Sequence, residues 1–542
     1  MTRRVLWSRR IPAVGGALVA DVVLPDDSPG GRWPTLVART PYGRQSFLRA
    51  PWTRLVDRGY ALVSCDVRGR GDSDGVFAAW EADTEDGVAV IDWAASQPWS
   101  TGDVGTIGGS YDGATQWWAA RGHPKALRCM VPMAVGVAGR EGERPFMNTG
   151  IPREYWMWWF ALTAGRTMQD VSAPSWQRHW GHRPLRTLHT KAGFPTAQWP
   201  KYVDGLIDFG GPTWRLSDAE LAGIDIPVLI TVGWWDDHTT LETWQQLQRG
   251  PHAQVRQLLV GPWDHAGNVF ARDRLGGEDV SAGMLDTLDV VGRFLDRHLK
   301  DPADAEPVPR IQLWRTGADT WEQPPAYPAP TVTLPLYLTE SNGGAGELVL
   351  EQPTTPRATQ WTHDARSPVT TLTQLDAFAW SDPPHDQRYL ESRSDVITFT
   401  SQPVNEPFRI SGRAQVRVTV SADALDADLY AWLTDVHPDG RSMLPAGIEF
   451  DGLRLSYRNG PERELLEPGV PVTVTLGCPW THHTFRPGHR IRLNISASLA
   501  PTDAPQYGTG AVWSVEPAGP PTTIRLHTGP DTPGALLLPV ER

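Results

Sequence analysis

The chain has 542 residues, of which 40% are hydrophobic and 21% charged, as in a globular protein of two or three domains. Its formal net charge of −12 argues against nucleic acid or an anionic membrane as the main partner. Three scattered cysteines (Cys65, Cys129 and Cys478) are too few for a disulfide framework or a zinc site.

The first 140 residues alternate apolar, strand-like runs with segments that favour helices. Residues 84–97 have apolar side chains at helical spacing, and the strand-like runs are residues 15–25, 35–39, 60–66, 104–107 and 129–135. This alternation predicts a mainly parallel sheet with helices on both faces, which binds its ligands at the carboxyl ends of the strands. Residues 1–10 lack the apolar segment of a secretory signal, and no apolar run is long enough to cross a membrane, so we expect a cytoplasmic protein.

Ser110 lies at a predicted turn between the strand-like run 104–107 and a helix-compatible run, residues 114–120. A serine in a tight strand-to-helix turn exposes its hydroxyl beside the free N–H groups of the next helix. The common form of this elbow is G-x-S-x-G, but Asp112 holds the second glycine position here and Gly113 follows it. Taken alone, the motif is also compatible with a glycine-rich turn capped by serine.

The pattern changes near Gly139, where strand alternation stops. Residues 154–162 form a dense aromatic run, and more tryptophans follow among proline, histidine and arginine. We predict short helices here, inserted between two strands of the sheet and placed as a cap over the strand ends. Most of the aromatic side chains are expected to form the core of the cap itself.

The sheet is predicted to resume after the cap, with strands at residues 226–233 and 257–261. The first of these strands leads into Trp234-Trp235-Asp236-Asp237-His238, and the second leads into Pro262-Trp263-Asp264-His265. A helix is expected over residues 239–249, and the amphipathic segment 284–300 forms another.

Three strand-end residues have the order of a hydrolase triad. A serine hydroxyl becomes nucleophilic when a base removes its proton and an acid orients the base. In α/β-hydrolases the order is serine, acid, histidine, each after a strand, and Ser110, Asp236 and His265 follow it. Asp237 is the alternative acid, and His238 is the alternative base.

An acyl-transfer site also needs donors for the developing oxyanion. The backbone N–H of Tyr111, the residue after the candidate nucleophile, is one. Tyr42 follows an early strand and can offer its hydroxyl as the second, although a packing role in a turn is an equal alternative.

The segment after Asp301-Pro302 contains more proline and short alternating runs with frequent turns. These runs predict an antiparallel sandwich of jelly-roll type; they are residues 332–338, 414–420, 470–476 and 490–495. The predicted domains are the first part of the α/β domain (1–140), the cap (141–217), the second part of the α/β domain (218–305) and the sandwich (306–542).

Several segments together resemble the cocaine esterase/X-Pro dipeptidyl-peptidase (CocE/NonD, S15) hydrolases, and the resemblance covers nearly the whole chain. The segments are Thr40-Pro41-Tyr42, Asp66–Ser73, Gly108–Gly113, Gly233-Trp234-Trp235-Asp236, Gly261–His265 and, in the C-terminal domain, Phe485–Leu493.

This resemblance implies an α/β-hydrolase domain with an inserted helical cap and a C-terminal jelly roll. The elbow of the family is G-x-S-Y-x-G, which accounts for Asp112 and matches Gly113. Motif by motif, it implies Ser110, Asp236 and His265 as the triad, with the Tyr42 hydroxyl and the Tyr111 N–H as oxyanion donors. Residues 68–73 are expected to brace the loops near the site.

The expected activity is hydrolysis of a small-molecule ester or amide with an apolar acyl group, through an acyl-enzyme. The side chains expected to contact that group are Trp156, Trp159, Phe160 and Trp235. The alternatives are an X-Pro dipeptidyl-peptidase or α-amino-acid ester hydrolase, with Glu154 and Asp237 as candidate partners of a substrate ammonium, and a biosynthetic acyltransferase or cyclase. We expect no cofactor and no metal, because His482-His483 has no metal-site partner in sequence, and we regard a homodimer as compatible with the sequence.

Overall fold

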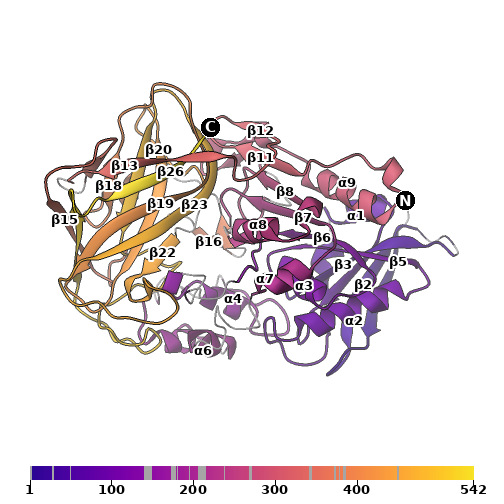
Figure 1. Cartoon of the computed structure of the whole chain (residues 1–542). Helices are drawn as coiled ribbons and strands as arrows, with labels where there is room; N and C mark the ends of the chain where they lie inside the picture. Colours follow the sequence, from indigo (N-terminus) through magenta and orange to yellow (C-terminus); the bar gives the residue numbers. More distant parts are fainter. Residues whose placement is uncertain are drawn as a thin grey trace.

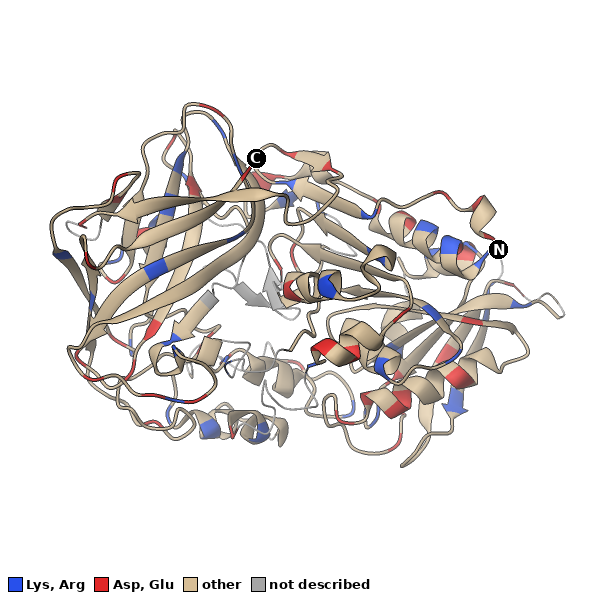
Figure 2. Ribbon diagram, in the orientation of Figure 1, with Lys and Arg blue, Asp and Glu red and all other residues tan. Residues whose placement is uncertain are grey.

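The computed structural model describes residues 3–26, 28, 30–48, 51–139, 144, 149–171, 179, 181–194, 196–204, 215–236, 239–267, 272–340, 345–371, 374–376, 379–381, 386–447 and 451–542. Figure 1 shows an α/β part on the right of the view and a β-rich part on the left. Among the described residues, no helix combines the length and the apolar character needed to cross a bilayer. Acidic and basic residues are interspersed over both parts (Figure 2), rather than gathered in the basic stripe typical of nucleic-acid binding.

The α/β part is built on one 10-stranded sheet, in the order β1-β2-β4-β3-β5-β6-β7-β8-β11-β12. Its neighbours from β4 to β11 are parallel, and the pairs at the two ends are antiparallel. The strands are β1 (Arg4–Ile11), β2 (Leu18–Leu24), β3 (Trp33–Thr40), β4 (Ala61–Asp66), β5 (Ser100–Gly109), β6 (Leu127–Met133), β7 (Val228–Gly233), β8 (Arg256–Gly261), β11 (Ile311–Arg315) and β12 (Thr320–Glu322).

Adjacent residues of the central strands pack in different cores, because successive side chains of a strand point to opposite faces. Ile230 and Val260 pack with α2 (Asp83–Ala95), α3 (Tyr111–Arg121) and α8 (Thr239–Arg249), whereas Leu229 and Leu259 pack with α1 (Thr53–Asp57) and α9 (Thr287–Leu299). Both faces of the sheet are therefore covered, as expected for strands with continuous apolar sequences.

The cap lies between β6 and β7 in sequence, and its described part contains short helices, as predicted. These are α4 (Trp156–Leu162), α5 (Leu188–Lys191) and α6 (Gln198–Val203), with α7 (Asp218–Gly223) leading back to the sheet. Most cap aromatics are buried in the same core cluster as α2 and α3, so the cap shares a core with the first domain. Trp176, Trp180 and Trp214 lie outside the described residues.

The β-rich part is a sandwich, which confirms the predicted fold class. Its core contains alternate residues of strands from both layers, such as Val416 and Val418 with Leu493 and Ile495. One layer has the strand order β15-β25-β19-β26-β13, with β23 also paired to β19. The hydrogen-bonded order continues into the other layer as β14-β18-β24-β20-β21, with β22 also paired to β20. The strands are β13 (Thr331–Leu338), β14 (Ala345–Val349), β15 (Arg357–His363), β18 (Ile397–Thr400), β19 (Phe408–Ala422), β20 (Asp428–Val436), β21 (Ser442–Met443), β22 (Asp451–Arg454), β23 (Val472–Phe485), β24 (Arg490–Ser496), β25 (Thr522–Thr528) and β26 (Ala535–Glu541).

Smaller elements complete the described fold. They are the two-stranded sheets β9 (Arg274–Leu275) with β10 (Glu278–Asp279) and β16 (Gln374–Asp376) with β17 (Ala379–Ser381), and the helix α10 (Arg388–Glu391).

The strands β11 and β12 lie after residue 306, where the sandwich is predicted to begin, but they belong to the first domain. They extend the sheet of the first domain, with Ile311 opposite Leu258 of β8, and the sandwich begins at β13. The prediction followed the rise in proline content, but composition does not reveal which sheet edge a strand joins.

A buried arginine joins the two domains at this edge. Arg315 of β11 is 1% exposed and contacts Glu322 of β12 at 2.9 Å and Glu541 of β26 at 2.5 Å. It also donates to the carbonyl of His483 in β23, at 3.3 Å. Arg409 of β19 pairs with the same two carboxylates, so the last strand of the chain is fixed to the edge of the first sheet.

Replacing Arg315 should therefore lower the stability of the folded protein. We expect Arg315→Met to lower the free energy of unfolding by about 3 kcal/mol, because it leaves two partly buried carboxylates short of a cation. Urea denaturation followed by tryptophan fluorescence measures this. The matched control is Arg486→Met, whose ion pair with Asp319 is about half exposed and should cost less than about 1 kcal/mol. Equal losses in the two variants would contradict the role given to Arg315.

Candidate active site

The elbow at Ser110 is a strained turn between β5 and α3. Ser110 has φ +57° and ψ −128°, a backbone conformation that non-glycine residues rarely adopt. A Cβ added to Gly108 would lie 2.6 Å from the Cβ of Asp112, and one added to Gly113 would lie 2.6 Å from Val135 Cγ1. The close packing therefore requires glycine at positions 108 and 113, whereas position 112 can hold a side chain.

Asp236 and His265 are in direct contact. They follow the neighbouring parallel strands β7 and β8, whose last residues, Gly233 and Gly261, lie opposite each other. The His265 Nδ1 and Asp236 Oδ1 atoms are 2.7 Å apart, and the Asp236 side chain is fully buried. A carboxylate that accepts the Nδ1–H leaves Nε2 as the basic nitrogen, which is the tautomer a general base needs.

The glycines at these strand ends permit a close approach of Trp263. A Cβ on Gly233 would lie 2.0 Å from the Trp263 carbonyl oxygen, and one on Gly261 would lie 2.3 Å from the Trp263 ring. The Trp235 N–H also donates to the Trp263 carbonyl at 3.1 Å, so the two segments that carry the acid and the base are bonded together. The alternatives Asp237 and His238 lie outside the described residues.

Tyr42 lies beside Ser110, just after β3. Its backbone N–H donates to Thr40 Oγ1 at 3.1 Å, and its hydroxyl accepts the indole N–H of Trp159 at 3.0 Å. Burial of this hydroxyl raises its pKa, with Asp112 adding to the effect, while hydrogen bonds with Trp159 and Ser110 lower it. The net pKa is far above neutrality, so the hydroxyl keeps its proton and can donate it to an oxyanion.

Tyr111 is the first residue of α3, where backbone N–H groups have no acceptor within the helix. Two hydrogen bonds hold its side chain in place. The hydroxyl donates to Asp83 Oδ2 at 2.6 Å and accepts the Trp80 backbone N–H at 2.9 Å. Asp83 in turn pairs with Arg39 of β3 at 2.6 Å, and both side chains are buried. This network fixes the residue whose backbone N–H is a predicted oxyanion donor.

Two of the predicted pocket aromatics, Trp156 and Trp159, lie beside the candidate oxyanion donors. Trp159 stacks on Trp80 and on Tyr111, with ring centroids 5.7 Å and 5.5 Å apart, and Trp156 meets Trp159 edge to face at 5.5 Å. These rings lie next to both candidate oxyanion donors.

Phe160 packs edge to face on Trp159, with ring centroids 5.4 Å apart, and both Phe160 and Trp235 also contact other parts of the protein. Phe160 is fully buried against Trp199 and Tyr202 of the cap, and Trp235 donates its indole N–H to the Leu444 carbonyl of the sandwich at 3.1 Å. Their contact with substrate stays a prediction.

Glu154 and Asp112 are buried carboxyl groups near these elements. Glu154 accepts the Gly181 N–H at 2.9 Å inside the cap, and burial raises its pKa to about 7 although Arg183 opposes the shift. Burial also raises the pKa of Asp112 well above its ordinary range, although a hydrogen bond with the Thr40 side chain opposes the shift.

Sequence reasoning assigned no role to Trp80 and Asp83, and it treated Arg70 only as part of a bracing stretch. Asp83 is an acidic residue at the start of a helix, a common position for one, and nothing in the sequence indicates its contact with Tyr111. Arg70 is fully buried and donates to the carbonyls of Pro41, at 2.7 Å, and of Thr163 in the cap, at 2.9 Å. It thus ties the Tyr42 loop to the cap, in agreement with the expected bracing.

The chain matches known family models and known proteins, and these matches agree with one another. A family model described as X-Pro dipeptidyl-peptidase (S15 family) matches residues 15–267, and one described as the X-Pro dipeptidyl-peptidase C-terminal non-catalytic domain matches residues 303–536. The cocaine esterase of Rhodococcus sp. (strain MB1 Bresler) is 30% identical over an alignment that covers 97% of this chain and 96% of the esterase.

Two solved structures share the fold over the whole chain. An aminopeptidase from the marine sediment archaeon Thaumarchaeota archaeon has a TM-score of 0.86 at 23% identity, covering 100% of this chain and 96% of its own. An α-amino acid ester hydrolase has a TM-score of 0.85 at 24% identity, with the same two coverages of 100% and 96%.

The hydrogen bond from Trp159 to Tyr42 can be tested by kinetics. We expect Trp159→Phe to lower kcat for ester hydrolysis roughly tenfold with little change in KM, since it removes one hydrogen bond from the Tyr42 hydroxyl. Tyr42→Phe alone should cost about 10²–10³ in kcat, and adding Trp159→Phe to it should cost little more.

Trp156→Phe is the matched control for this pair, because it alters the same aromatic group and leaves the contact between Trp159 and Tyr42 in place. Additive losses in the double variant, or an equal loss of kcat in the control, would show that Trp159 acts only by packing.

Proposed function

This chain belongs to the X-Pro dipeptidyl-peptidase (S15) family of serine hydrolases, and we propose that it is an esterase or acylase for small molecules with an apolar acyl group. As a member of this family it is a serine hydrolase. The observation that carries the proposal is the strained Ser110 elbow beside the Tyr42 hydroxyl, at the same sheet edge as the bonded pair of Asp236 and His265.

In the proposed mechanism, Ser110 attacks the substrate carbonyl while His265 Nε2 takes the hydroxyl proton. Asp236 orients the imidazole and stabilises the imidazolium that forms. The Tyr42 hydroxyl and the Tyr111 N–H donate to the oxyanion. His265 then protonates the leaving group, and water repeats the sequence to release the acid and restore Ser110.

The nature of the acyl group is inferred from the aromatic cluster around the oxyanion donors. The ring centroids of Trp80 and Trp159 lie 5.8 Å and 5.5 Å from that of Tyr111, and Trp156 packs edge to face against both tryptophans. All three tryptophans contribute large apolar surfaces. A flat aromatic acyl group fits such faces better than acetyl does. Cocaine esterase, the relative with 30% identity, is named for a substrate that is an ester.

The second candidate function is an X-Pro dipeptidyl-peptidase or an α-amino-acid ester hydrolase. The name of the matching family favours it, and so does the buried Glu154 carboxyl in the cap. An enzyme of that kind must pair the ammonium of its substrate with a carboxylate. Glu154 already accepts a backbone N–H of the cap and is fully enclosed, so we prefer the esterase.

The assignment of Ser110 is tested by substitution and labelling. We expect Ser110→Ala to lower kcat for an aryl ester by a factor on the order of 10⁶ and to abolish covalent labelling by a fluorophosphonate. Ser96→Ala, at an exposed serine of the same domain, is the control and should keep both. Labelling that persists in Ser110→Ala would place the nucleophile elsewhere.

The substrate class is tested by comparing a phenyl benzoate with a glycyl-prolyl anilide. We expect kcat/KM to favour the benzoate by about 100-fold or more, because the aromatic cluster recognises its acyl group. Glu154→Gln should leave the rate on the benzoate within about twofold of the wild type. A preference for the anilide that Glu154→Gln abolishes would assign the dipeptidyl-peptidase function instead.

A further inference from the structure

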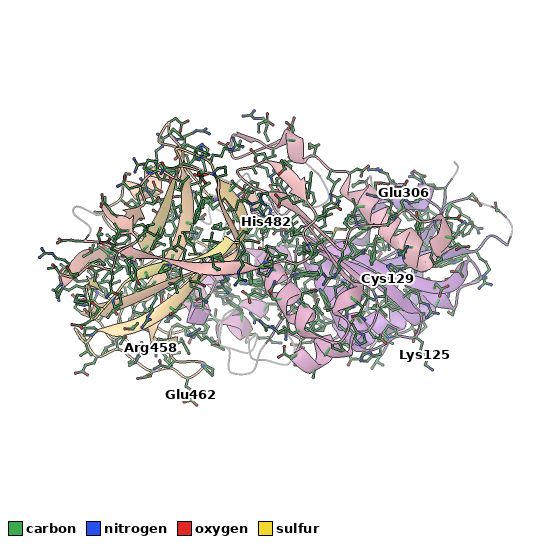
Figure 3. All side chains as sticks on the ribbon, turned by 45° about the horizontal axis from the view of Figure 1, so that its top comes forward. Lys125, Cys129, Glu306, Arg458, Glu462 and His482 are labelled. Atoms are coloured by element: carbon green, nitrogen blue, oxygen red, sulfur yellow. The ribbon has the colours of Figure 1, made fainter. Side chains whose placement is uncertain are left out.

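A group of histidines and one aspartate lies at the end of the sandwich that faces the first domain. Asp435 is near the end of β20, and His437 follows two residues later, in the turn to β21. His489 precedes β24, the strand paired with β20, so the two turns lie side by side. His483 of β23 is the fourth member, and its neighbour His482, labelled in Figure 3, lies where the sandwich meets the first domain.

The nitrogen atoms of these histidines converge on the Asp435 carboxylate. His489 Nδ1 is 2.9 Å from Oδ1, His483 Nε2 is 3.2 Å from Oδ2, and His437 Nε2 is 4.0 Å from Oδ2. One ligand atom from each of Asp435, His437 and His489 lies within 4.8 Å of the other two. Asp435 is buried and the two histidines are partly buried.

These separations are close to those around a bound transition metal. Zinc bonds to histidine nitrogen and carboxylate oxygen measure about 2.0–2.2 Å, so tetrahedral ligand atoms lie roughly 3.4 Å apart. Metal binding requires the His437 ring to move toward Asp435, because its Nε2 atom is 4.0 Å from Oδ2. The metal would replace the proton that His489 Nδ1 and Asp435 Oδ1 share.

The groups around the cluster hold it in this arrangement. The His437 backbone is bonded at both polar groups within its turn, to Arg441 at 2.8 Å and to Gly440 at 2.9 Å. The His483 Nδ1 atom is 2.9 Å from the hydroxyl of Thr316, in the turn after β11. Contacts of this kind orient the ring of a metal-binding histidine.

The charge of Arg441 near the cluster is balanced. Its guanidinium donates to His437 Nδ1 at 3.3 Å, and it pairs with Asp439 at 2.9 Å and with Glu278 at 2.5 Å. Metal binding through His437 Nε2 therefore requires the ring proton to move to Nδ1 and the guanidinium to turn toward its carboxylate partners. Two carboxylates therefore offset this cation, and the Asp435 carboxylate supplies negative charge for a metal.

We propose that Asp435, His437 and His489 bind one divalent transition-metal ion, with His483 as a fourth ligand or a supporting group, and that Zn²⁺ fits this set of nitrogen and oxygen ligands. The site cross-links two turns of the sandwich next to the β11–β12 turn of the first domain. It contains none of the residues of the candidate active site, so the proposal is independent of the proposed function. It also differs from the expectation of no metal, because the partners of His483 lie far from it in sequence.

The test uses the full chain, purified without a histidine tag and stripped of metal with a chelator. Calorimetric titration with Zn²⁺ should give one site per chain, and Co²⁺ should give visible absorption bands of a site with histidine ligands. We expect His437→Ala and His489→Ala to weaken Zn²⁺ binding at least about tenfold. Zn²⁺ should also raise the melting temperature of the wild type by more than that of either variant.

His252→Ala, at a partly buried histidine near α8, is the matched control and should bind Zn²⁺ like the wild type. His437→Ala leaves the contacts of Asp435 with His483 and His489 in place, and His437→Gln serves in its stead if the alanine variant melts at a lower temperature without metal. Absence of stoichiometric binding to the wild type, or equal binding by the His437 variants and the control, would overturn the proposal and leave a hydrogen-bonded histidine cluster.

Discussion

The hydrogen bond between His265 and Asp236 depends on the parallel pairing of two adjacent strands. The 2.7 Å contact forms because β7 and β8 end level with each other, at Gly233 and Gly261. Both positions lack a side chain, so the backbone of Trp263 can approach and bond to the segment that carries the acid. A buried carboxylate needs such a partner, since its desolvation is costly when it is unpaired.

The cap does more than cover the end of the sheet. Its Trp159 bonds to the Tyr42 hydroxyl, and its carbonyl at Thr163 accepts from Arg70, which also holds Pro41. The candidate oxyanion donor is thus held by groups from the sheet and from the insertion together. The position of the Tyr42 hydroxyl therefore depends on the position of the cap, through direct contacts.

The sandwich supports the segment that carries the candidate acid. Leu444 accepts the indole N–H of Trp235, and the Gly447 N–H donates to the carbonyl of Trp234, at 3.1 Å and 2.7 Å. Arg315 and its two carboxylates join the same domains at the edge of the sheet. The C-terminal domain is in this sense part of the framework of the site, although no candidate catalytic residue comes from it.

The sequence by itself determined the fold class, the helix at residues 239–249 and the order Ser110, Asp236, His265, because strand ends and elbow glycines leave local patterns. It did not reveal that β11 and β12 join the first sheet, that Asp83 holds Tyr111, or that Asp435 gathers histidines from two turns. Each of these features is a contact between segments far apart in the chain. Only packing in three dimensions decides such contacts, since the burial and charge of a residue depend on neighbours that a local pattern does not contain.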